Sequence, residues 1–258
     1  MTSHSSGKPP IQPMQPLQPP HADRFVLLAT GGTIAGTAAS ADDTLGYRAA
    51  QLSGAALLAG LRAAVPALVA LPIEVEEVAR LDSKDMDFAT WQALARAVAR
   101  HAARAEVRAI VITHGTDTLE ETAYFLQRVL APAKPVVLTA AMRPATAREA
   151  DGPVNLRDAF AVAAHPQARG VVAVLAGQVW SGLALRKAHT QALDAFTAGG
   201  AAPVARVVEG AAGTEVPLQV SLQVPLQVQV LGPWPGGTVA WCTTTPWRAA
   251  TSAKRSPQ

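Results

Sequence analysis

Residues 24–36 read RFVLLATGGTIAG, and this stretch gives the first indication of the fold. Arg24 to Ala29 form a short apolar run that Thr30-Gly31-Gly32 closes, a pattern typical of a buried parallel strand ending in a glycine loop. Comparable apolar runs recur along the chain: Ile73 to Ala79, Val107 to Thr113, Pro135 to Ala140 and Gly170 to Ala176. The chain therefore contains a series of predicted buried strands.

Stretches with helical periodicity separate these strands: Leu52 to Ala64, Phe88 to Arg104, Leu119 to Leu130 and Val154 to Ala164. In the second stretch, apolar residues recur at three- and four-residue steps, while its arginines lie off that apolar face. The alternation predicts an α/β fold, an open, mostly parallel, Rossmann-like sheet with helices on both faces. In such sheets the ligand site lies beyond the carboxyl ends of the strands.

The composition fits a folded domain, because 49% of the 258 residues are hydrophobic, enough to bury one good core. The formal net charge of +3 is scattered along the chain, so we expect no nucleic-acid partner. A single cysteine, Cys242, excludes an internal disulfide, and the six histidines lack ligand spacing, so we expect no metal. Without a membrane-length apolar run or a signal-peptide segment, we expect a cytoplasmic protein that does not contact membranes.

The two ends of the chain differ in composition from its middle. Residues 1–23 hold six of the 20 prolines among glutamine and serine, which predicts a disordered leader. Residues 216–230 read VPLQVSLQVPLQVQV, a four-residue repeat that fits one amphipathic strand or an extended ribbon. Three of the five tryptophans follow it, and no acidic residue does. We expect residues 24–208 to form the folded domain and 209–258 an atypical, repetitive tail.

The loop after the first predicted strand, Thr30 to Gly36, resembles a phosphate-binding loop but fails both common patterns. Thr33 stands where a dinucleotide fingerprint needs its second glycine, and no Gly-Lys-Ser/Thr of a Walker loop follows. We therefore expect no cofactor here. A glycine loop that presents the Thr33 hydroxyl to a small ligand fits the spacing, and an ordinary glycine turn is the alternative.

A second polar motif, THGTDTLEETA over residues 113–123, joins a predicted strand to a predicted helix. Thr118 and Glu121 have the spacing of a capping box, which predicts a structural N-cap. Thr116 and Asp117 then lie just outside the helix N-terminus, where a carboxylate is stabilised and a hydroxyl can meet a substrate. His114 could act as a base, but a lone histidine in a tight turn is more often structural.

Together the two motifs resemble the signatures of the bacterial-type L-asparaginase family, in particular its larger N-terminal catalytic domain. The resemblance extends in unbroken order over residues 24–208. Further matching segments are Thr44-Leu45-Gly46-Tyr47, LDSKDM at 81–86, AMRP at 141–144, ADGPVNL at 150–156, Leu185-Arg186-Lys187 and LDAF at 193–196. The resemblance implies hydrolysis of L-asparagine to L-aspartate and ammonia, with glutamine as a further candidate substrate.

The resemblance also assigns catalytic and binding residues. By this likeness Thr33 attacks the side-chain carbonyl to form an acyl-enzyme, and Tyr47 helps to take its proton. Thr116, Asp117 and Lys187 match a second triad, in which lysine assists the threonine hydroxyl and a water is oriented for deacylation. Asp117 is also expected to bind the substrate α-ammonium. Ser83, with nearby backbone N–H groups, is expected to bind the α-carboxylate.

Two further matching segments are interpreted as structural. Met142-Arg143-Pro144 and the run from Asp151 to Leu156 are expected to fix the loop beneath the site without touching substrate. Pro153 suits the first turn of a helix, and Asp151 suits its cap.

Two departures from the family pattern leave alternatives open. Lys84 stands where many members have a glutamine or glutamate that contacts the substrate amino group, so its charge either repels that group or points away. In the family, a smaller C-terminal domain of a neighbouring subunit supplies an acidic group to the site, and residues 209–258 contain no counterpart. The resemblance implies a homo-oligomer, whereas such a tail favours irregular association.

Three functional interpretations follow. The first is a working amidohydrolase, and the second is a folded but catalytically impaired asparaginase that at most binds an amino acid. The third, a glutamyl-tRNA amidotransferase subunit that shares this fold, is disfavoured because no extra tRNA-facing segment is seen.

Overall fold

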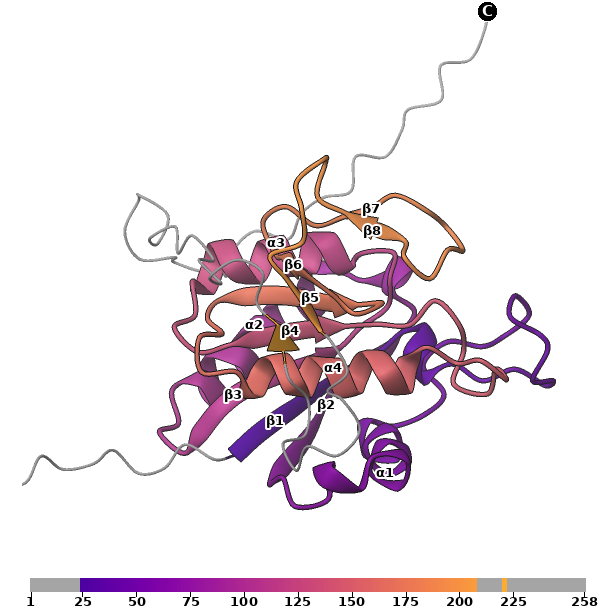
Figure 1. The fold of residues 1–258 in the computed structure, drawn as a ribbon, viewed down its shortest axis with the longest axis horizontal. Helices are drawn as coiled ribbons and strands as arrows, with labels where there is room; N and C mark the ends of the chain where they lie inside the picture. Colours follow the sequence, from indigo (N-terminus) through magenta and orange to yellow (C-terminus); the bar gives the residue numbers. More distant parts are fainter. Residues whose placement is uncertain (1–23, 208–219, 222–258) are drawn as a thin grey trace, which may run out of the picture.

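A single eight-stranded sheet organises the computed structural model, which describes residues 24–207 and 220–221 (Figure 1). Its strands are β1 (Arg24–Gly31), β2 (Ile73–Leu81), β3 (Val107–Thr113), β4 (Val136–Thr139), β5 (Val171–Leu175), β6 (Gln178–Ser181), β9 (Ala205–Val207) and β10 (Val220–Ser221). Their order across the sheet is β10-β9-β6-β5-β4-β3-β1-β2. Neighbouring strands from β2 to β5 are parallel, and β6, β9 and β10 add an antiparallel margin. The predicted α/β fold with a mostly parallel sheet is confirmed.

Helices cover both faces of this sheet. They are α1 (Gly54–Ala64), α2 (Phe88–Ala102), α3 (Leu119–Leu130) and α4 (Gly152–Ala164), with short 3₁₀ turns at Thr33–Ala35, Pro66–Leu68 and Ser83–Asp85. Successive β1 side chains alternate between the two faces: Phe25 and Leu27 pack with α1 and α4, whereas Val26 and Leu28 pack with α2 and α3. Because central strands are buried on both faces, they read as continuous apolar runs.

The elements that the sequence did not predict are short and lie away from the centre of the sheet. β6, β9 and β10 have two to four residues each, too few for a clear hydrophobic period. A separate two-stranded hairpin, β7 (Arg186–Lys187) with β8 (Phe196–Thr197), carries the family-matching lysine. β10 lies within the repetitive segment. The predicted leader 1–23 and the rest of 209–258 lie outside the described residues.

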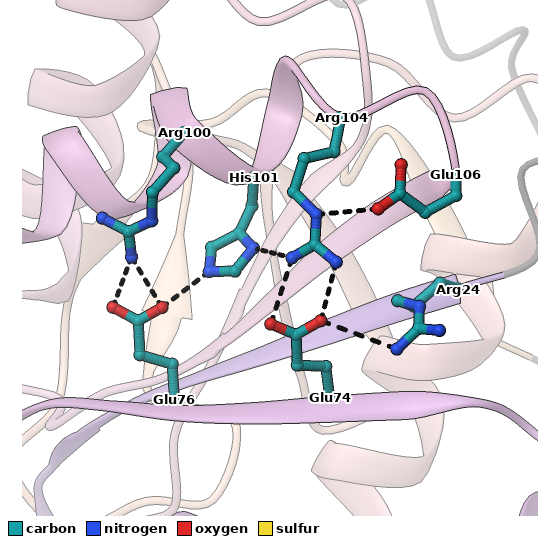
Figure 2. Close-up of polar contacts among 7 residues, drawn as sticks. All are labelled: Arg24, Glu74, Glu76, Arg100, His101, Arg104 and Glu106. Atoms are coloured by element: carbon teal, nitrogen blue, oxygen red, sulfur yellow. Dashed lines mark hydrogen bonds and ion pairs between the residues drawn. The ribbon is translucent and has the colours of Figure 1, made fainter.

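A network of charged and polar side chains ties the edge strand β2 to α2 and β1 (Figure 2). Its members are Arg24, Glu74, Glu76, Arg100, His101, Arg104 and Glu106. Arg104 binds the Glu74 carboxylate through both terminal nitrogens, at 3.0 and 2.9 Å, and Arg100 binds Glu76 at 2.6 Å. These residues lie near the amino ends of β1 and β3, the edge opposite the glycine loops. Charges on an exposed edge strand also discourage pairing with another chain.

The network predicts loss of stability in acid. The hydrogen bond from Arg104 holds the pKa of Glu74 below its ordinary value of 4.5, and that from Arg100 does the same for Glu76. The stabilisation is therefore present above pH 4.5 and is lost as the pH falls through the lowered values. Replacing Glu74 by Gln should lower the urea concentration at the unfolding midpoint by roughly half a molar or less at pH 6. The fall of this midpoint between pH 5 and pH 3 should also be less steep in the variant than in the wild type. An unchanged decline in Glu74→Gln, measured beside Glu121→Gln, would contradict this assignment.

Candidate active site

Three loops meet where β1, β2 and β3 end. Gly32 donates its N–H to the carbonyl of Leu81 at 2.9 Å, which joins the first loop to the second. A Cβ built on Gly32 would lie 2.5 Å from the Gly115 Cα, and one on Gly115 would lie 2.4 Å from Ser83 Oγ. Gly32 also has a φ of 77°. The absence of side chains at these two glycines therefore lets the loops carrying Thr33, Ser83 and Thr116 pack against one another.

Thr33 is paired with Tyr47 in the first of these loops. The two hydroxyl oxygens are 2.7 Å apart, and Thr33 is buried, with 8% of its surface exposed. Thr33 begins a 3₁₀ turn directly after the glycines, so its position is set by the end of β1. The Tyr47 ring passes so close to Gly36 that a Cβ there would lie 2.8 Å from it. A threonine hydroxyl is thus held against a phenol that can exchange a proton with it.

The segment that carries Tyr47 is fastened to the loop after β4. Ala145 donates its N–H to the carbonyl of Gly36 at 2.8 Å, and Thr146 Oγ1 accepts the N–H of Ala38 at 2.8 Å. A cavity of about 450 Å³ lies between the two segments and is bordered by Tyr47. Its size is within the range of small-molecule sites. Neither Thr33 nor Thr116 lines it.

Thr116, Asp117 and Lys187 form a second polar group. The Lys187 ammonium donates to Thr116 Oγ1 at 2.9 Å and to Asp117 Oδ1 at 2.6 Å. Thr116 is buried and the Lys187 side chain is 18% exposed, whereas the Asp117 side chain is 50% exposed. Lys187 is about 70 residues away in sequence and reaches the site from the β7–β8 hairpin. The chain thus brings all three matched residues into contact.

Ser83 lies between the second and third loops. Its hydroxyl oxygen accepts the N–H of Asp117 at 3.1 Å, and its side chain is buried. The hydroxyl proton is not used in that bond, so it can be donated to a carboxylate. Thr118 occupies the N-cap position of α3, as predicted, but its side chain does not cap the helix. The capping-box prediction is wrong, since no such bond forms. The Thr118 hydroxyl donates to the carbonyl of Ser83 at 2.9 Å.

Asp151 and Asn155 hold the loop beneath the site. The Asp151 carboxylate accepts the N–H groups of Met142 and Arg143, each at 2.9 Å. Asn155, buried in α4, donates to the Ala140 carbonyl and to Asp151. Asp151 therefore stands at the N-cap position of α4 without capping it, because its carboxylate is used by the preceding loop. Pro153 lies in the first turn of α4, as predicted.

Lys84 belongs to the second of these loops and is bonded within it. Its ammonium lies 2.5 Å from Asp82 Oδ2, and the side chain is 63% exposed. The hydrogen bond that it donates to Asp82 raises the pKa of Lys84 above its ordinary value. The ammonium is held by Asp82 but stays within electrostatic range of Asp117, so both alternatives for this residue stay open.

His114 lies behind Thr116 in a hydrogen-bonded chain with a fixed direction. Trp91 Nε1 donates to Thr122 Oγ1 at 2.8 Å, and Thr122 Oγ1 lies 3.0 Å from His114 Nε2. His114 Nδ1 lies 2.7 Å from the Gly115 carbonyl, which can only accept. Nδ1 therefore carries the proton, and Nε2 accepts the Thr122 hydroxyl. Burial lowers the pKa of His114 to about 4, so the ring is neutral and structural.

The buried histidine predicts a second pH dependence. An unfolded histidine binds a proton below pH 6.5, but the folded ring does so only near pH 4, so stability falls as pH drops through that window. The decline amounts to on the order of 3 kcal/mol. His114→Gln should remove it and should also cost roughly 1–3 kcal/mol at pH 7 through lost hydrogen bonds. Urea unfolding at pH 7 and pH 4.5, with the exposed His189→Gln as control, measures both effects. A wild-type pH slope in His114→Gln would show that the ring is not the buried neutral group described.

Several groups that support the site were not predicted from the sequence. Trp91 and Thr122 were assigned only to helices, and Asn155 only to a matching segment. Glu120 was also missed, although it stands inside the THGTDTLEETA motif and accepts the backbone N–H of Lys187. The sequence did offer a signal for Glu120, because it stands in the first turn of a helix that begins at the candidate site.

Within residues 24–207 and 220–221, no cluster of three or more histidine, cysteine, aspartate or glutamate residues could hold a metal ion. No helix in this described part is long and apolar enough to cross a membrane.

Comparison with known proteins places this arrangement in a family. Residues 24–219 match the family model described as "Asparaginase, N-terminal". The chain is 42% identical over 188 residues to a "Glutaminase-asparaginase" of Pseudomonas fluorescens biotype A, covering 72% of this chain and 51% of that protein. It is also 42% identical over 175 residues to a "Probable L-asparaginase periplasmic" of Haemophilus influenzae, covering 67% and 48%.

A solved structure agrees with these sequence matches. The structure of a "Probable Cytoplasmic L-asparaginase" from Campylobacter jejuni has a TM-score of 0.70 and 37% identity, covering 79% of this chain and 59% of that one. The chain spans about half the length of the curated relatives it matches. With the family model matching most of its length, the chain belongs to the asparaginase family.

Proposed function

We propose that this protein is an amidohydrolase that releases ammonia from the side-chain amide of L-asparagine through a threonine nucleophile. The observation that carries the proposal is that two buried threonine hydroxyls, on loops in contact, are each bonded to a group that can handle a proton. Thr33 has Tyr47 at 2.7 Å, and Thr116 has Lys187 at 2.9 Å. Relatives named asparaginase and glutaminase-asparaginase support the same reaction class.

In the first half of the proposed reaction, Thr33 Oγ1 attacks the side-chain carbonyl carbon of asparagine. Its proton passes by way of the Tyr47 hydroxyl toward the leaving nitrogen, which departs as ammonia and leaves a threonyl ester. Backbone N–H groups of the glycine loop are candidates to stabilise the oxyanion, because glycine lets the backbone approach closely.

In the second half, water hydrolyses the ester, releases aspartate and restores the Thr33 hydroxyl. The Lys187 ammonium donates to Thr116 Oγ1, and the Thr116 hydroxyl held in this way can orient the water, whose proton returns to Thr33 Oγ1 as the ester bond breaks. Lys187 is 18% exposed, so its charge acts in a partly dry environment, where electrostatic help is stronger than in water.

We further propose how the amino acid is held. Asp117 keeps one carboxylate oxygen on Lys187 and exposes half of its side chain, so its other oxygen can accept the substrate α-ammonium. The Ser83 hydroxyl proton is free for the α-carboxylate, as described above. Lys84 is bonded to Asp82, which partly neutralises its charge near the proposed ammonium site.

The test is ammonia release from L-asparagine and from L-glutamine by the purified protein, with calorimetric titration of L-aspartate as the binding measurement. We expect release from asparagine together with aspartate binding. Aspartate binding without ammonia release would favour the folded, catalytically impaired interpretation. Neither binding nor release would reject the site altogether.

The cytoplasmic location and the oligomeric state stay predictions. The matched relatives include one named periplasmic and one named cytoplasmic, so the family does not decide location. Size-exclusion chromatography of the full chain distinguishes a symmetric oligomer from irregular association.

A further inference from the structure

We propose that Glu120 is a positioning residue that directs the Lys187 ammonium onto Thr116 by holding the backbone of β7. The inference deepens the proposed function and rests on the role given there to Lys187. Glu120 does not touch Thr33, Thr116 or Asp117 in any described contact, so it acts through Lys187 alone.

The Glu120 carboxylate makes two contacts with β7. Glu120 Oε2 accepts the backbone N–H of Lys187, and Glu120 Oε1 lies 3.9 Å from Arg186 Nε. The Glu120 side chain is only 22% exposed. It belongs to the first turn of α3, where the helix dipole stabilises a negative charge. One carboxylate therefore fastens the lysine backbone to the helix whose N-terminus adjoins Thr116 and Asp117.

The hairpin needs such a fastening because its own pairing is slight. β7 has two residues and pairs only with β8, outside the eight-stranded sheet. Leu185 and Phe196 are buried in the core beside it, so the base of the hairpin stays in place without Glu120. These apolar contacts are not directional, whereas the hydrogen bond to the Lys187 N–H fixes the rotation of the strand about its own axis. We infer that Glu120 determines the direction of the lysine side chain.

A small error in that direction has a large kinetic effect. The Lys187 ammonium must satisfy Thr116 and Asp117 at once, at 2.9 and 2.6 Å. A displacement of about 1 Å in a catalytic group can cost on the order of 100-fold in rate. We therefore expect loss of Glu120 to lower kcat and to leave KM nearly unchanged, since Asp117 and Ser83 keep their positions.

The experiment compares Glu120→Ala, Glu120→Gln and the control Glu121→Ala in the full-length protein. Glu121 is in the same helical turn and exposed, so its replacement tests for a general effect on α3. Glu120→Ala should lower kcat for asparagine by roughly tenfold or more, and Glu120→Gln, which keeps an acceptor oxygen, should recover most of that loss. A kcat in Glu120→Ala equal to that of Glu121→Ala would overturn the proposal.

Hydrogen exchange of the Lys187 amide gives a second readout that does not need activity. It should be faster in Glu120→Ala than in wild type by about tenfold, while the Ala188 amide, bonded to Ala195 within the same hairpin, should stay protected. If the wild type releases no ammonia, the proposed function fails, and this exchange measurement still decides whether Glu120 holds Lys187. Unchanged exchange at Lys187, or faster exchange at both amides, would reject the positioning role.

Discussion

Thr33→Ala is expected to abolish ammonia release, with kcat for asparagine falling by at least about 10³-fold. The substitution removes the proposed nucleophile, the oxygen that lies 2.7 Å from the Tyr47 hydroxyl. It deletes little volume, so the free energy of unfolding should change by about 1 kcal/mol or less. Stopped activity with an intact fold is the signature of a lost nucleophile, and the ammonia assay with thermal unfolding measures both.

Thr33→Ser is the matched control for this prediction. Serine keeps the hydroxyl and loses only the methyl group, so it should restore much of the turnover that alanine loses. Aspartate should bind both variants, because Ser83 and Asp117 are untouched. Near-normal turnover in Thr33→Ala would show that Thr33 is not the nucleophile and would transfer that role to Thr116, the threonine bonded to Lys187.

The centre of the fold could be predicted because each central element carries its own signal. The run of buried residues in β1 and the helical spacing of α2 are local patterns, and their alternation implies a parallel sheet. Boundaries shifted by a few residues: α4 begins at Gly152, two residues before its predicted start at Val154, and β1 ends at Gly31. The antiparallel margin was not predicted, because strands as short as β9 are defined by their partners and not by their own pattern.

Local sequence patterns predicted less of the candidate site than of the fold. Thr33, Thr116 and Asp117 stand in motifs that follow strands, so topology alone places them at one edge. The pairing of Tyr47 with Thr33 and the reach of Lys187 across about 70 residues were expected only from the resemblance, because no local pattern indicates them. The capping-box prediction for Thr118 failed because its backbone, with φ −126° and ψ 22°, lies outside the β region typical of a capping residue, and tertiary packing directs its hydroxyl to the Ser83 carbonyl.

Lys187→Met should lower kcat by roughly 10²–10⁴-fold without raising KM. Methionine keeps much of the apolar stem but removes the ammonium that bonds Thr116 and Asp117. Deacylation then loses the ammonium that holds the Thr116 hydroxyl, whereas the Asp117 carboxylate gains an oxygen for the substrate ammonium. The backbone bond to Glu120 survives, because it involves the Lys187 N–H and not the side chain.

The direction of the change in KM separates this prediction from a simple loss of binding. Asp117→Ala, which removes the proposed ammonium partner, should raise KM as well as lower kcat. Lys134→Met is the control, because Lys134 bonds the carbonyl of Arg104, in the polar network at the opposite edge of the sheet, and should leave both constants unchanged. Burst kinetics should show the acyl-enzyme accumulating in Lys187→Met, since attack by Thr33 retains Tyr47 while hydrolysis of the ester is slowed. A raised KM with an unchanged kcat would mean that Lys187 serves binding alone, and the second triad would then have no part in the chemistry.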